Sequence, residues 1–329
     1  MRFTCTFIVA ALAAAPASGQ VQPAPGYKAE LYFGNPQADQ ALVSFDWGWD
    51  GALYYSTGAT NWLPGMSVWR QDAGGSSLVF EDAGVYAGSW VAAAGQNVYF
   101  NEDSHFRVYA TDGAGPPRLV LEQPNLWGLF PRGQDMFLSG ADAFWTAALY
   151  VAPIDASGNP GAPVELGKVG SGSGPLAWDA DGNFYVAEGY NGSAQPGVFR
   201  FSAAELEAAM ADPAGAALNS AGHLWTTLER YLGGGATGLA FDGQGGLLVT
   251  ATIFDGPSEL RRYDIAGGVA GDYTVLGTSP SRLTTVRVAD GLAYVASPEG
   301  IYCVSTPEPA TLGALAAGLG AMLLRRRRG

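Results

Sequence analysis

The sequence predicts an all-β protein: a six-bladed β-propeller whose N-terminal strand closes the last blade, followed by a C-terminal transmembrane helix. Three observations predict the ring. Short apolar strands meet at a glycine-containing turn six times, these turns lie 38 to 64 residues apart, and strands such as Leu247 to Val249 are apolar without alternation. A repeat of roughly 40 to 50 residues with several strands is typical of propeller blades, whose middle strands are covered on both faces.

Each unit begins with a hairpin and continues with outer strands. The hairpins are expected at Phe45 to Tyr55, Val91 to Phe100, Leu129 to Leu138, Leu176 to Ala187, Leu239 to Thr250 and Val286 to Ala296. The third and fourth strands are expected at Ser67–Arg70 with Ser77–Phe80, Phe106–Ala110 with Arg118–Leu121, Ala148–Ala152 with Val164–Leu166, Gly197–Phe201 with Leu224–Leu228, and Glu259–Tyr263 with Tyr273–Leu276.

The sixth unit has a third strand, Gly300 to Val304, but no fourth. Tyr27 to Phe33 alternates as a strand and has no blade of its own, so we expect it to supply the missing strand and remove an exposed sheet edge. The longest gap between turns has a local cause. Ser202 and Glu205 form a capping box that predicts a helix through Met210, inserted in blade four.

The stretches Leu176 to Val186 and Gly238 to Val249 resemble the repeats of NHL-type and gluconolactonase-type six-bladed propellers. This resemblance implies the fold over residues 27 to 304 and transfers no catalytic residue. The rival architecture is a β-sandwich pair or a jelly roll, which would not predict six similar units.

Both ends of the chain have features of export signals. Met1 and Arg2 precede an apolar core from Phe7 to Ala15 and a small-residue cleavage site, which predicts a signal peptide over residues 1–19. The propeller domain is then expected over residues 20–305, and the sorting segment over residues 306–329. We expect the protein to be exported to the cell envelope, the outer surface or the extracellular space.

The C-terminal segment combines a polar motif, an apolar run and a basic end. The motif is Pro307, Glu308 and Pro309. The anchor residues are Leu312, Leu315, Leu319, Leu323 and Leu324, and the cytoplasmic stop is Arg325, Arg326, Arg327 and Arg328. This tail resembles the PEP-CTERM sorting signal of bacterial surface proteins. The resemblance implies exosortase as a partner, a transient inner-membrane anchor and an association with exopolysaccharide; an ordinary C-terminal anchor is the alternative.

Composition excludes some functions. The net charge of −13 makes nucleic acid a poor partner. His105 and His223 lack the spacing of a zinc site, and Cys303, the one cysteine outside the signal peptide, is expected to be a buried small side chain. No nucleophile elbow or phosphate-binding loop occurs, and Gly170 to Gly174 is expected to be a flexible connector.

The remaining candidates concern metals and sugars. Asp179 to Asn183 is expected to be a hairpin turn rather than a calcium loop. The acidic residues Asp46, Asp50, Glu102, Asp103 and Asp142 are candidates for a Ca²⁺ site in the central channel. The tryptophans, among them Trp47, Trp49, Trp62, Trp90, Trp127 and Trp145, are candidates for sugar stacking, although packing between blades is favoured.

These observations favour a non-catalytic binding or structural propeller in the cell envelope or extracellular matrix, with polysaccharide as a candidate partner. They predict no catalytic residue, no metal ligand and no cofactor. The alternative is a secreted propeller enzyme, lactonase-like or lyase-like, with a divalent cation in the central channel.

Overall fold

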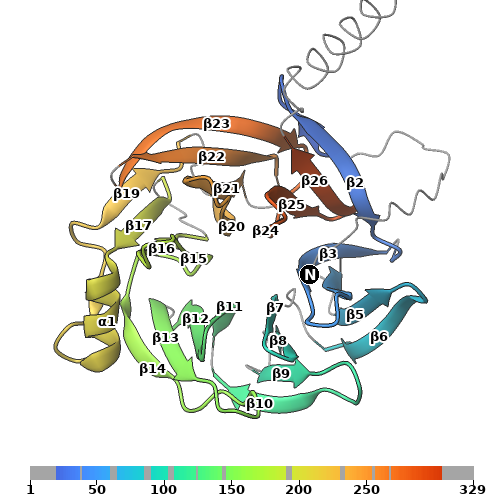
Figure 1. The fold of residues 1–329 in the computed structure, drawn as a ribbon, viewed down its shortest axis with the longest axis horizontal. Coiled ribbons are helices and arrows are strands. Elements are labelled where there is room, and N and C mark those ends of the chain that lie inside the picture. The colour runs from blue at the N-terminus through green and yellow to red at the C-terminus, as the bar shows by residue number, and fades with distance from the viewer. Residues whose placement is uncertain are drawn as a thin grey trace, which may run out of the picture.

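The computed structural model describes residues 20–37, 39–59, 65–84, 90–102, 107–123, 125–142, 146–189, 195–229, 234–253, 256–266 and 268–305. They form six sheets of four or five strands, arranged as blades around a central axis (Figure 1). The all-β, six-bladed prediction is therefore confirmed. The signal peptide, the sorting motif, the anchor and the arginine stop lie outside the described residues, so these assignments remain predictions.

The blades follow chain order, with the innermost strand of each first. Blade 1 is β3 (Gln40–Trp47), β4 (Leu53–Ala59), β5 (Met66–Asp72) and β6 (Gly75–Asp82). Blade 2 is β7 (Val91–Ala94), β8 (Asn97–Glu102), β9 (Arg107–Thr111) and β10 (Arg118–Glu122). Blade 3 is β11 (Leu126–Arg132), β12 (Asp135–Ala141), β13 (Ala147–Pro153) and β14 (Val164–Lys168).

The second half repeats the arrangement. Blade 4 is β15 (Leu176–Trp178), β16 (Phe184–Ala187), β17 (Gly197–Phe201) and β19 (Leu224–Thr227). Blade 5 is β20 (Gly234–Phe241), β21 (Gly246–Ile253), β22 (Ser258–Ala266) and β23 (Val269–Ser279). Blade 6 is β24 (Val286–Ala289), β25 (Leu292–Ser297), β26 (Gly300–Ser305) and, from the N-terminal part of the chain, β2 (Lys28–Gly34).

The ring closes as the sequence predicts. Strand β2 pairs antiparallel with β26, from Lys28 opposite Ser305 to Gly34 opposite Gly300 (Figure 1). Two short strands were not expected: β1 (Gln22–Pro23) adds to β23, and β18 (Leu218–Asn219) pairs in parallel with β14. Both pair with outer strands and extend the hydrogen bonding of two sheet edges.

The predicted helix is α1 (Ala203–Ala211), which lies outside blade 4 between β17 and β19 (Figure 1). The Ser202 side chain accepts a hydrogen bond from the Glu205 backbone N–H, and the Glu205 carboxylate accepts one from the Ser202 N–H, so the capping box is present. Among the described residues, no helix has the length and apolar character that a membrane span requires.

The hydrophobic core lies between neighbouring blades rather than at the axis. Tyr54 and Val68 of blade 1 pack in one cluster with Val91 and Phe100 of blade 2. Phe100 is fully buried, and burial of such a ring stabilises the fold by about 3 kcal/mol. Because every blade presents apolar side chains to both neighbours, the strands lack polar alternation, as the sequence predicts.

The two ends of the ring differ in the chain segments they present. We call the end where the second strand of each blade finishes the mouth face. We call the opposite end, with the turns between first and second strands and between third and fourth strands, the hairpin face. Rotation about the axis relates the blades, so equivalent turns lie at the same end.

Candidate functional site

Three consecutive blades place a carboxyl side chain at the end of the second strand. Glu102 ends β8, Asp142 follows β12 and Glu188 follows β16. Glu102 is 0% and Glu188 is 5% exposed, and the side chain of Asp142 is 13% exposed. Burial of carboxylates disfavours their charged form unless hydrogen bonds or cations compensate, so their partners decide what each group can do.

Glu188 binds the segment that leads into blade 4, residues 170–174, which we call the blade 4 entry. Its carboxylate accepts hydrogen bonds from the Ser171 N–H at 2.6 Å, the Ser171 hydroxyl at 2.8 Å and the Gly197 N–H at 2.5 Å. The Gly174 N–H also donates to the Ser139 hydroxyl of blade 3 at 3.1 Å. The segment from Gly170 to Gly174, expected to be a flexible connector, thus forms hydrogen bonds with both blade 3 and blade 4.

The other two carboxylates have basic partners. Lys168 Nζ donates to Asp142 Oδ2 at 2.5 Å, which raises the pKa of Lys168, and Asp142 Oδ1 accepts the Thr146 N–H at 2.9 Å. Glu102 Oε2 lies 3.9 Å from Arg107 Nη1, and the Arg107 side chain is 39% exposed. Glu102 and Arg107 thus pair a buried carboxylate with a cation that reaches solvent.

The central channel contains an arginine. Arg287 of β24 donates from Nη2 to the Val91 carbonyl at 3.1 Å, and its Nε lies 3.4 Å from Asp46 Oδ2. The Ala93 N–H donates to the same Asp46 oxygen at 3.1 Å. A guanidinium beside Asp46 repels a divalent cation, so Asp46 does not fit the expected calcium site.

The other acidic candidates do not converge with Asp46. Asp50 lies at the hairpin face, where it accepts from Arg70 Nη2 at 2.9 Å, whereas Glu102 and Asp142 lie at the mouth face. Asp103 lies outside the described residues. Within the described ranges, no three His, Cys, Asp or Glu side chains are placed to share a metal ion.

The Asp179 loop is a hairpin turn, as predicted. Asp179 Oδ1 accepts the Asp181 N–H at 3.0 Å and the Asn183 N–H at 2.8 Å, and Oδ2 accepts from Asn183 Nδ2 at 2.7 Å. This carboxylate is occupied by its own turn and does not form a calcium loop.

Most of the described candidate tryptophans pack between blades. Trp90 contacts Trp127 at 4.8 Å between ring centroids, and Trp47 contacts Tyr294 at 4.9 Å. Trp49 differs, because 59% of it is exposed at the hairpin face. Trp62 and Trp145 lie outside the described residues.

The histidine and cysteine candidates have separate environments. His223 Nε2 lies 2.9 Å from Glu205 Oε1, which links β19 to the start of α1. Cys303 is half-buried on β26 and packs at the edge of a core cluster. His105 lies outside the described residues.

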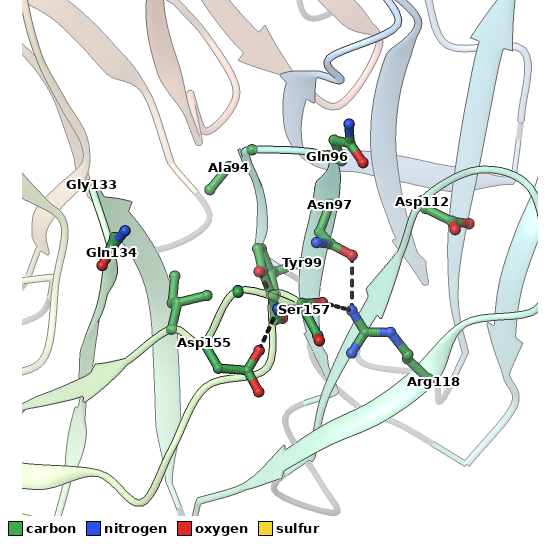
Figure 2. Close-up of a pocket in the computed structure, with 14 residues that line it drawn as sticks. Ala94, Gln96, Asn97, Tyr99, Asp112, Arg118, Gly133, Gln134, Asp155 and Ser157 are labelled. Carbon is green, nitrogen blue, oxygen red and sulfur yellow. Dashed lines mark hydrogen bonds between the residues drawn. The ribbon is translucent and has the colours of Figure 1, made fainter.

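A pocket of about 520 Å³ opens at the hairpin face between blades 2 and 3 (Figure 2). Arg118 of β10 bridges the two blades: Nη2 donates to Asn97 Oδ1 at 2.9 Å and to the Ser157 carbonyl at 3.1 Å, and Nη1 donates to Asn159. The Tyr99 hydroxyl donates to the Gly158 carbonyl at 2.9 Å. Sequence reasoning missed this pocket, because its walls come from turns that are far apart in the chain, from Ala94 to Gly158.

Comparison with known proteins establishes the fold alone. No protein-family model and no curated protein matches the sequence. Among the solved structures that match over nearly their whole length, the PQQ-bound aldose sugar dehydrogenase of Streptomyces coelicolor has a TM-score of 0.57 at 14% identity. The match covers 86% of this chain and 99% of that chain. The gluconolactonase XC5397 of Xanthomonas campestris has a TM-score of 0.54 at 15% identity, with 88% and 99% covered.

The third is the virginiamycin B lyase of Staphylococcus aureus, with a TM-score of 0.51 at 9% identity and 85% and 99% of the two chains covered. These matches correct two expectations. The predictions of no enzyme and no cofactor rested on missing sequence motifs, yet these three similar proteins are enzymes and one is PQQ-bound. The chain thus has the six-bladed architecture of gluconolactonase-type propellers.

Proposed function

We propose that this chain is an exported propeller enzyme that hydrolyses a cyclic ester, or opens one by elimination, at the mouth face. The observation that carries the proposal is the buried Glu102 carboxylate beside the solvent-reaching Arg107. A carboxylate can act as a general base, and a neighbouring arginine can bind the oxygen on which negative charge develops. The fold likeness to a gluconolactonase and a lyase supports the reaction class.

The couple has the groups that such chemistry needs. The 3.9 Å between Glu102 Oε2 and Arg107 Nη1 exceeds a direct hydrogen bond, and a water can bridge groups at this separation. In hydrolysis, the water oxygen bonds to the ester carbonyl carbon while Glu102 accepts its proton. Arg107 binds the carbonyl oxygen, the ring C–O bond breaks, and the proton returns to the leaving alkoxide.

In elimination, the same carboxylate removes a proton from the carbon next to the breaking C–O bond. The two reactions give different products, a hydroxy acid and an unsaturated acid.

A matched pair of variants tests the assignment. Glu102→Gln is expected to lower kcat/KM for aldonolactone ring opening by about 100-fold, as loss of a general base does, with little change in Tm. Glu122→Gln is the control, because Glu122 also lies 3.9 Å from Arg107 but is exposed on the outer strand β10. Equal activity of the two variants, or no ring opening by the wild type across a panel of lactones and cyclic depsipeptides, would overturn the proposal.

We also propose that exosortase sorts the protein through residues 306–329, after transient anchoring in the inner membrane. The support is the order of Pro307, Glu308 and Pro309, the leucine-rich run and the terminal arginines. The test is an inert exported reporter fused to residues 306–329 in a host that has the sorting peptidase. Processing that is lost with Glu308→Gln is expected, and an unprocessed wild-type fusion would refute the assignment.

A further inference from the structure

We propose that the pocket between blades 2 and 3 binds a neutral, hydroxyl-rich ligand, a saccharide, at the hairpin face (Figure 2). This site is separate from the mouth face and does not depend on the proposed reaction. Its volume of about 520 Å³ lies within the roughly 300–1,000 Å³ of small-molecule sites.

Two identical turns form part of the pocket wall. Gly95-Gln96 joins β7 to β8, and Gly133-Gln134 joins β11 to β12, with Ala94 paired to Asn97 and Arg132 to Asp135. The glycines have φ of 57° and 62°, as the first position of a type II′ turn requires. Each turn therefore presents a glutamine at its second position, and Figure 2 shows Gln134 on one side of the pocket and Gln96 on the other.

The walls are fixed before any ligand binds. Arg118 joins Asn97 of blade 2 to the 157–159 turn of blade 3, as described above. Within that turn, Asp155 Oδ1 accepts the Ser157 and Asn159 N–H groups, each at 2.8 Å, which hold the pKa of Asp155 below its usual value. Preorganised walls lower the entropy cost of ligand binding.

The polar groups of the pocket wall that are not used in hydrogen bonds within the protein indicate the class of ligand. In the described part of the chain, the side-chain amides of Gln96 and Gln134 hydrogen-bond no other residue, and Asp112 uses only Oδ1, to accept the Ala114 N–H at 2.9 Å. Each carboxamide offers donors and an acceptor, which match the donor and acceptor character of hydroxyl groups. The ligand is therefore expected to have hydroxyls on two opposite sides.

The charges in the wall argue against ionic ligands. Asp112 and Asp155 disfavour an anion, and the Arg118 guanidinium disfavours a cation. Arg118 also donates to three protein groups already, so it is poorly placed to hold a carboxylate or phosphate. A neutral sugar meets these conditions.

Titration calorimetry of the purified full-length chain tests the site with cellobiose and maltose as probes, against glucuronic acid, glucosamine and CaCl₂. Binding of a neutral disaccharide is expected, weakened about 5- to 10-fold by Gln96→Ala and again by Gln134→Ala, because each variant removes one hydrogen-bonding group. Gln244→Ala is the matched control, because Gln244 lies in the corresponding exposed turn of blade 5.

Three results would overturn the inference. These are no heat with either neutral disaccharide, tighter binding of a charged probe or Ca²⁺, and equal losses with Gln244→Ala. Glu102→Gln is expected to leave sugar binding unchanged, and Gln96→Ala to leave ring opening unchanged. The site and the proposed reaction can therefore fail independently.

Discussion

The mouth face and the hairpin face use the same residue types in different ways. At the mouth face, carboxylates are buried and glycine backbones touch: a Cβ on Gly174 would lie 2.1 Å from the Ala187 carbonyl oxygen, and one on Gly235 would lie 2.3 Å from Gly189. At the hairpin face, Asp179 and Asp242 cap their own turns, and a Cβ on Gly243 would meet nothing within 4 Å. Close backbone contacts thus stabilise the mouth face, whereas aspartate side chains stabilise their own turns at the hairpin face, where Arg118 also joins blades 2 and 3.

The largest expected loss of stability comes from replacing a tightly packed glycine at the mouth face. Gly174→Ala is expected to destabilise the protein by about 3 kcal/mol, because backbone atoms of blade 4 cannot move away from the new methyl group. For a protein of this size, Tm would fall by roughly 4–6 °C.

Gly243→Ala is the hairpin-face control. Gly243 has φ of 73° and open space around its Cβ position, so only conformational strain of about 1 kcal/mol is expected. Differential scanning calorimetry measures both variants. Equal Tm losses would show that the two faces are packed alike.

An intermediate effect is expected from the carboxylates. Glu188→Ala removes the acceptor of one buried and two partly buried hydrogen bonds, which is expected to cost about 2 kcal/mol. Asp179→Ala removes the acceptor of a half-buried turn and is expected to cost about 1 kcal/mol.

Calorimetry at pH 7 measures the stability losses of the Glu188→Ala and Asp179→Ala variants. Hydrogen exchange of the Ser171 amide shows whether the loss in Glu188→Ala arises at the blade 4 entry. Faster exchange at Ser171 is expected in Glu188→Ala only. Unchanged protection would show that Glu188 does not hold the blade 4 entry.

The smallest effect depends on pH and involves α1 at the hairpin face. The Ser202 hydroxyl and His223 lower the pKa of Glu205 from 4.5 to about 2. A carboxylate with a lowered pKa in the folded state stabilises the fold above pH 4.5, and this contribution is lost as pH falls towards 2. Because the Glu205 side chain is 49% exposed, solvent screening limits the contribution to less than about 1 kcal/mol.

The measurement compares Tm of the wild type and Glu205→Gln at pH 6 and pH 2.5. A wild-type advantage is expected at pH 6 and should shrink at pH 2.5. A constant difference across this range would contradict the role assigned to the Glu205 carboxylate.

Local features of the fold were predictable because few neighbouring residues decide them. Ser202 and Glu205 lie three positions apart, so the sequence already shows both halves of the capping box. The Gly95 turn and the strands on each side of it were predictable for the same reason. The closing strand β2 was predictable from a count of strands, since the sixth blade lacked one.

The candidate sites were less predictable because their partners are distant in the chain. Asp46 was expected to bind a metal cation. Instead, the Arg287 guanidinium of blade 6 lies beside its carboxylate. Glu188 was not predicted as a site residue, since its partner Ser171 lies in a segment whose composition indicated flexibility. Catalysis remained only the alternative in the sequence-based prediction, because the sequence contains no recognisable catalytic motif.

The amino-acid order by itself determined the number of blades, the turns within them, the capped helix and the closing strand, because apolar periodicity and turn chemistry act over a few residues. Tertiary structure alone decided which carboxylates are buried and which cap turns, that Arg287 enters the channel, and that two glutamine turns flank one pocket. These features depend on contacts between blades, and the rotation of each blade about the axis sets those contacts.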